Sequence, residues 1–161
     1  MSSSARFVLG YSLLLFAVAG CSSTQSDPCR LLGVAEAQSF DATISSSMAF
    51  PPQGTEKNDL CVFSNANGDP RLMVFVWSDP TIDPLDATKS GMRDGDARVV
   101  EIAGVGQKAA AAFGSGELKL FAARNSKGMI GVRVRDPIRQ TDAKFDDVKA
   151  LVTKLLGRLG H

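Results

Sequence analysis

Hydrophobic residues recur along most of this chain with the periods expected of helices and strands. The clearest helix is C-terminal, beginning near Thr141 or Asp142, with apolar residues at spacings of three and four. These residues are Phe145, Val148, Leu151, Val152, Leu155, Leu156 and Leu159. We expect this stripe to cover the open face of a sheet; docking on a partner or a membrane is the alternative.

Two β-hairpins are predicted from stretches rich in Val, Phe, Leu and Ile that flank clusters of turn residues. The first joins residues 60–64 to residues 71–78, and the second joins residues 117–124 to residues 129–135. Strict alternation in residues 131–135 predicts that one face of this last strand meets water.

Shorter segments complete the predicted sheet. Residues 41–50 alternate in part and end at a Pro-Pro pair, which indicates an edge strand. Residues 98–102 form a further strand, and the apolar run 109–113 is expected to be buried.

Three helices are expected besides the C-terminal one. Asp27-Pro28 is a typical helix start, and Gly33 divides the stretch that follows into a tight first turn and a second helix ending near Phe40. Residues 85–93 form a short third helix. The order of elements predicts an α+β fold: an antiparallel sheet of about five strands with N-terminal and C-terminal helices packed on it, in one domain spanning residues 27–161.

The N-terminus has the layout of a secretory signal peptide. Arg6 precedes an apolar run over residues 7–19 that is too short to span a bilayer core of about 30 Å. Val18-Ala19-Gly20-Cys21 resembles the lipobox of bacterial lipoproteins. We therefore expect removal of residues 1–20, lipidation of Cys21, and a polar tether over residues 21–26; an ordinary cleavage site with a chance cysteine is the alternative.

If Cys21 carries lipid, two cysteines remain, Cys29 and Cys61, and they can pair with each other. A structural disulfide is predicted, closing a loop of about 33 residues and stabilising the fold by about 3–4 kcal/mol. A redox or metal site is the alternative, but the close spacing of such sites is missing. Without Arg6 the chain has 17 basic and 17 acidic residues, so we expect no nucleic-acid partner.

Few residues suit catalysis. The single histidine is the terminal His161, and the single tyrosine, Tyr11, lies in the leader. Loop carboxylates are the remaining candidates for a hydrolase or a calcium site: Asp79, Asp83, Asp94 and Asp96. Gly104-Val105-Gly106-Gln107-Lys108-Ala109 matches a dinucleotide fingerprint only superficially, and a tight turn explains it better. We expect no enzyme activity, no cofactor and no metal.

Phe75 and Trp77 are the best candidates for a binding face. They alternate with Val74 and Val76, so the two pairs face opposite sides of the sheet. A side without helices would expose apolar surface; a sheet covered on both faces is the alternative.

A resemblance to a known group rests on several short motifs. They are the lipobox, Asp27-Pro28-Cys29-Arg30-Leu31-Leu32 with Glu36, Cys61 in a hairpin, the Gly104-Val105-Gly106 turn, and the terminal Leu-Gly-Arg-Leu helix. Together they resemble the small secreted lipoproteins of unknown function common in actinobacteria. The resemblance implies a lipid anchor on the extracytoplasmic face of a membrane and provides no catalytic residue.

These observations predict an envelope lipoprotein with a non-catalytic domain that binds a protein or another envelope component. A carrier of a small apolar ligand or lipid is the alternative function. In a cell with two membranes, Ser22 after Cys21 favours the outer one, because retention at the inner membrane commonly uses aspartate there.

Overall fold

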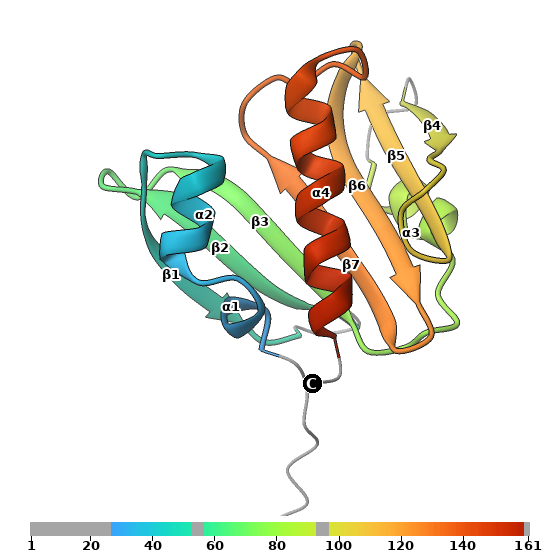
Figure 1. Cartoon of the computed structure of the whole chain (residues 1–161), viewed down its shortest axis with the longest axis horizontal. Helices are drawn as coiled ribbons and strands as arrows, with labels where there is room; N and C mark the ends of the chain where they lie inside the picture. Colours follow the sequence, from blue (N-terminus) through green and yellow to red (C-terminus); the bar gives the residue numbers. More distant parts are fainter. Residues whose placement is uncertain (1–26, 53–56, 93–96, 160–161) are drawn as a thin grey trace, which may run out of the picture.

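The computed structural model describes residues 27–52, 57–92 and 97–159, which form one sheet with helices on both faces (Figure 1). The leader, Cys21 and the tether lie outside these residues. The strands are β1 (Ile44–Phe50), β2 (Asp59–Asn65), β3 (Pro70–Trp77), β4 (Arg98–Glu101), β5 (Lys108–Gly114), β6 (Glu117–Asn125) and β7 (Gly128–Val134). The helices are α1 (Pro28–Leu31), α2 (Val34–Phe40), α3 (Pro84–Ser90) and α4 (Ala143–Arg158).

All strand pairs in the sheet are antiparallel, and the strand order is β1-β2-β3-β7-β6-β5-β4. Two meanders, β1–β3 and β4–β7, therefore join where β3 pairs with β7. That junction runs from Leu72 opposite Val134 to Trp77 opposite Met129. The sheet is continuous because this pairing connects segments far apart in sequence.

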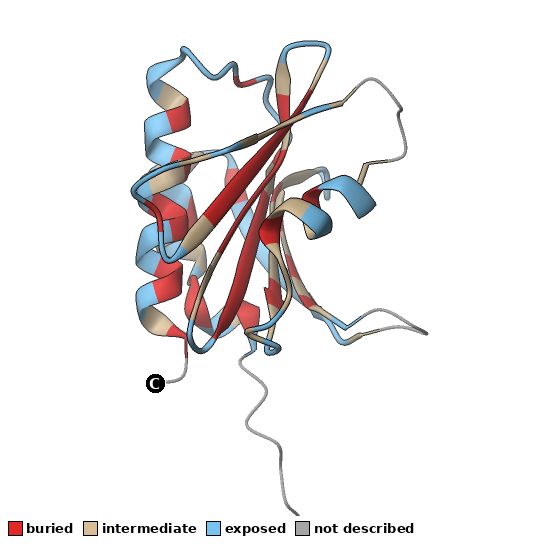
Figure 2. Cartoon of the chain, turned by 90° about the vertical axis from the view of Figure 1, so that its right-hand side faces the viewer, coloured by how far each residue is buried: buried red, intermediate tan, exposed pale blue. Residues whose placement is uncertain are grey.

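The helices are divided between the two faces of the sheet. Helices α1, α2 and α4 lie on one face, and α3 lies on the other (Figures 1 and 2). Phe63, Val74, Phe121 and Val132 point from the strands into a fully buried core beneath the first group, and Val152 of α4 meets them there. The C-terminal apolar stripe therefore covers the sheet, as its spacing predicts.

The α+β class, both hairpins and the edge strand are confirmed, but the sheet has seven strands rather than about five. The run after Gln107 is β5, which pairs with both β4 and β6. Its four consecutive alanines give no alternation and little strand propensity, which is why the sequence predicts only burial there. Both faces of this strand are covered, so small side chains suit it.

The expectation that one face of residues 131–135 meets water holds at Arg133, which is partly exposed, and at Arg135, which is exposed just beyond β7, but it is wrong at Gly131. Of β7, only Arg133 has appreciable exposure. Gly131 is buried because the Trp77 ring lies on it, where an added Cβ would come within 2.8 Å of the ring. The neighbouring strand supplies the cover that the local sequence lacks.

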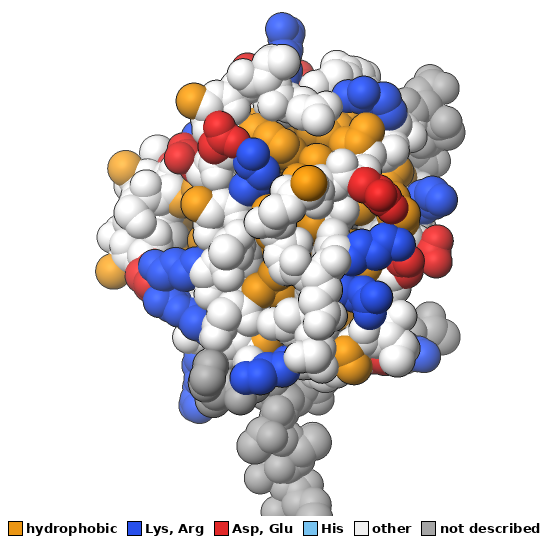
Figure 3. All heavy atoms as spheres, turned by 45° about the vertical axis from the view of Figure 1, so that its right-hand side comes forward, with side chains coloured by type: hydrophobic (Ala, Val, Ile, Leu, Met, Phe, Trp, Pro, Cys, Tyr) orange, Lys and Arg blue, Asp and Glu red, His pale blue; other side chains and the backbone are white. Residues whose placement is uncertain are grey.

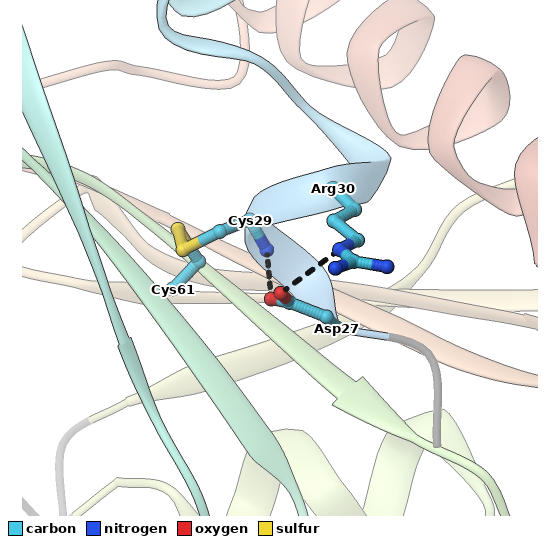
Figure 4. The surroundings of a disulfide bond; sticks show 4 residues. All are labelled: Asp27, Cys29, Arg30 and Cys61. Carbon is cyan, nitrogen blue, oxygen red and sulfur yellow. Dashed lines mark hydrogen bonds and ion pairs between the residues drawn. A yellow bond between two sulfur atoms is a disulfide. The ribbon is translucent and has the colours of Figure 1, made fainter. Parts of the chain in front are cut away.

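The disulfide between Cys29 and Cys61 is present and links α1 to β2 (Figure 4). Asp27 caps α1 by accepting a hydrogen bond of 2.9 Å from the Cys29 backbone N–H. Cys61 is fully buried. The bond thus fastens the N-terminal helix to the sheet, as the sequence predicts.

The last helix is tied to the first two by charge. The Arg158 guanidinium donates to both carboxylate oxygens of Glu36, each at 2.7 Å, and to the Leu31 carbonyl at 2.6 Å. The Lys154 ammonium lies 2.6 Å from Glu36. Hydrogen bonds from Arg158 and Lys154 hold the pKa of Glu36 well below its ordinary value, so the Glu36 carboxylate is ionised at neutral pH.

Candidate functional site

Part of the sheet face opposite α4 is left open. Helix α3 packs on β4, β5 and β6, and no described helix covers β1, β2 and β3 on that side. The side chains that face it are Met48, Phe50, Leu60, Val62, Met73, Phe75 and Trp77. Met48 and Phe50 are 62% and 36% exposed, and the others are partly exposed. We call these seven residues the open apolar face.

Phe75 and Trp77 lie on β3, at the side of the open apolar face that borders β7. Their rings stack with centroids 5.8 Å apart. The Trp77 ring is held flat because Gly131, on the adjacent strand, has no side chain beneath it. The structure therefore brings together the two residues that the sequence singled out and adds the glycine that positions one of them.

A hollow of about 590 Å³ lies between this aromatic pair and α3. Leu60, Phe75 and Trp77 form its sheet side; Ala87 of α3 and Ile82, in the loop before α3, form the opposite side. Leu120, Asn58, Asp86, Ser90, Gly91 and Arg133 complete the lining. We call it the apolar hollow; its size is in the range of small-molecule sites, about 300–1,000 Å³.

A second hollow, of about 670 Å³, adjoins the first and shares Ser90, Gly91 and Arg133 with it. Its charged lining residues are Glu117, Lys119, Arg133, Arg135 and Asp136. Both carboxylates have partners, because Glu117 lies 3.3 Å from Lys119 and Asp136 lies 2.7 Å from Arg71. Since no described carboxylate pairs with Arg133 or Arg135, we call this space the cationic hollow.

The two described loop carboxylates, Asp79 and Asp83, are each engaged by neighbouring side chains. Asp79 accepts two hydrogen bonds from Thr81, which lower its pKa. Asp83 caps α3 and lies 2.7 Å from Lys108, which also lowers its pKa. Asp94, Asp96 and His161 lie outside the described residues. Asp79 and Asp83 therefore form structural hydrogen bonds and an ion pair near the N-terminal end of α3.

The glycine-rich segment before β5 is a turn. Gly104 and Gly106 have φ of 82° and 60°, and a Cβ at Gly106 would lie 2.5 Å from the Arg124 carbonyl oxygen. A strand, not a helix, begins at Lys108. A dinucleotide fingerprint needs a helix N-terminus at that point, so the resemblance to one is superficial.

Other surfaces are of mixed character. On the side that carries α4 and β4, Lys and Arg side chains are interspersed with Asp and Glu around small hydrophobic patches (Figure 3). Within residues 27–52, 57–92 and 97–159, no three His, Cys, Asp or Glu side chains gather to hold a metal. None of the helices in these ranges is both long and apolar enough to cross a membrane.

The sequence alone did not indicate that Arg133 and α3 line the two hollows. Arg133 alternates with Val132 and Val134, so its pattern resembles any half-exposed strand arginine. Its position beside α3 depends on the β3–β7 pairing and on the face that α3 takes, and neither has a local signal. No protein-family model, curated protein or solved structure matches the chain.

Proposed function

We propose that this chain is an envelope lipoprotein, anchored through Cys21, whose non-catalytic domain binds an envelope protein through the open apolar face. The observation that supports the binding role is the exposure of that face. A contiguous apolar surface on a folded domain is typical of an interaction site, whereas single exposed apolar residues are ordinary. Met48, at 62% exposure, lies on β1 at the sheet edge, where a partner has direct access.

The lipid anchor is supported by the lipobox-like tetrapeptide and by the cysteine pairing. Cys29 and Cys61 are bonded to each other, which leaves Cys21 as the one thiol available for acylation. We place the domain on the extracytoplasmic face of a membrane, where disulfides persist. Metabolic labelling with a fatty-acid analogue tests this step, and labelling that survives Cys21→Ser would contradict it.

Site-specific photocrosslinking in living cells tests the binding role. A photoreactive amino acid at Met48 is expected to yield a defined crosslinked protein, and Phe50→Ser in the same chain is expected to abolish it. The matched control position is Thr153, on the exposed side of α4. Absence of any product at Met48, or an identical product at Thr153, would contradict binding through the open apolar face.

A second function, carriage of a small apolar ligand, is favoured by the apolar hollow. Its volume and its aromatic lining suit a ligand with a hydrophobic body. Organic extraction of the protein purified without detergent, followed by mass spectrometry, is expected to release one lipid class at close to one equivalent. A protein that is free of lipid and binds none when it is added would contradict carriage.

A further inference from the structure

We infer that the two adjoining hollows form one site for an anionic amphiphile, with its hydrophobic chain in the apolar hollow and its acidic head group at Arg133. This inference deepens the carrier function proposed above. It rests on three features of the structure: the junction between the hollows, a guanidinium at that junction with which no described carboxylate pairs, and the change from apolar to charged lining across the junction.

The junction is formed by residues common to both hollows, Ser90 and Gly91 of the α3 end and Arg133 of β7. On one side of it the lining is dominated by Leu60, Phe75 and Trp77. On the other side it is dominated by charged groups. A molecule lying across the junction therefore meets hydrophobic surface at one end and positive charge at the other.

Arg133 is held in place but has hydrogen-bonding capacity to spare. Its Nε donates to the Lys119 carbonyl at 3.1 Å, which fixes the guanidinium at the junction. Four further N–H donors remain on an arginine held in this way. Since no described carboxylate pairs with it, these donors can bind a carboxylate or phosphate oxygen, and a bidentate pair of this kind is strong.

The rest of the lining sets the orientation of the ligand. Trp77 pairs with Met129, and Arg133 lies four residues further along β7, so Trp77 lies about 13 Å along the strand direction from the Arg133 backbone. Asp86 lies one helical turn before Ser90, toward the other end of the apolar hollow. Its negative charge disfavours an acidic head group there, and Arg135 reinforces the positive charge at the Arg133 end.

Equilibrium dialysis with labelled ligands provides the test, using the mature chain from residue 21 with Cys21→Ser, so that neither the apolar leader nor an acyl group of its own competes. The probes are oleate, oleyl alcohol with the same chain and no charge, and inorganic phosphate. We expect oleate to bind about tenfold or more tightly than the alcohol, and phosphate alone to bind weakly. Trp77, the single tryptophan, reports where the ligand lies through its fluorescence.

Arg133→Met is expected to weaken oleate binding about tenfold while leaving the alcohol nearly unchanged. Arg133→Lys retains the charge and is expected to recover part of the loss. Arg139→Met is the matched control, because Arg139 is exposed and lines neither hollow. Circular dichroism and a urea midpoint establish that each variant folds, and Arg133→Lys provides the comparison if Arg133→Met does not.

The outcomes separate this inference from the carrier function on which it rests. Equal binding of oleate and oleyl alcohol, or oleate binding insensitive to Arg133, would overturn the head-group assignment and leave a carrier of neutral lipids. Phosphate binding as tight as oleate binding would overturn the amphiphile and leave a simple anion site. Binding of none of the probes would overturn both the inference and the carrier function.

Discussion

Removal of the Cys29–Cys61 disulfide is the perturbation whose energetic cost the structure defines best. The bond joins residues 32 apart in sequence, so it closes a loop of about 33 residues in the unfolded chain. The chain-entropy relation gives about 4 kcal/mol for a loop of that length. Small domains are stable by about 5–15 kcal/mol, so this one bond provides a large share of the stability.

The double variant Cys29→Ala/Cys61→Ala removes the bond without leaving a free thiol. Cys61 is fully buried, so its truncation adds a packing loss of about 1 kcal/mol to the loop entropy. Alanine is preferred to serine at this position because a buried hydroxyl would lack a partner. We therefore expect the free energy of unfolding to fall by about 4–5 kcal/mol in total.

Urea unfolding followed by circular dichroism measures this difference. The variant is expected to unfold at lower urea with a steeper dependence on denaturant, because its unfolded chain is less compact. The wild-type chain treated with a reducing agent is expected to behave like the variant. A difference below about 1 kcal/mol, with unchanged steepness, would refute the reasoning and show that α1 is held to the sheet by packing alone.

Three further outcomes follow from the structure. Burial raises the pKa of Asp41, but hydrogen bonds from Thr43 and Arg71 outweigh this effect and lower the pKa to about 2. The ionised carboxylate therefore contributes about 2 kcal/mol of stability above pH 5, and wild type loses this contribution as the pH falls from 5 to 2. We expect Asp41→Asn to remove it, and urea unfolding across pH measures the difference. Gly131→Ala is expected to displace the Trp77 ring, shifting its fluorescence to the red at a cost of about 1 kcal/mol; an unchanged spectrum would contradict the contact. Arg158→Met is expected to cost about 1–2 kcal/mol, and thermal melts at neutral pH should show most of this loss disappear in a Glu36→Gln background.

Locally determined elements could be predicted from the sequence. The turn between β2 and β3 is one example, because the Asn65 side chain accepts hydrogen bonds from the backbone N–H groups of Asn67 and Asp69, and Gly68 has φ of 82°. The caps of α1 and α3 are others, since Asp27 and Asp83 each accept a backbone hydrogen bond.

The remaining features depend on residues far apart in sequence. The pairing of Phe75 with Gly131 across β3 and β7 has no local signal, yet it provides the surface on which Trp77 lies. Helix α3 was predicted as an element, but the face it takes depends on how β4–β6 pack against it. Arg133 therefore had the pattern of an ordinary strand residue, although it lies at the junction of two hollows.

The β3–β7 junction also bears on the order in which the chain can fold. An exported chain emerges from the membrane with its N-terminus first, so the segments of β1, β2 and β3 are outside before Val134, the partner of Leu72, has emerged. Until β7 arrives, one edge of β3 has no strand beside it, and its apolar residues lie at an unprotected sheet margin. Such long-range closure slows folding and prolongs exposure to aggregation. The emerging chain is therefore most vulnerable before its C-terminal third has crossed the membrane, a period in which a chaperone has most to protect.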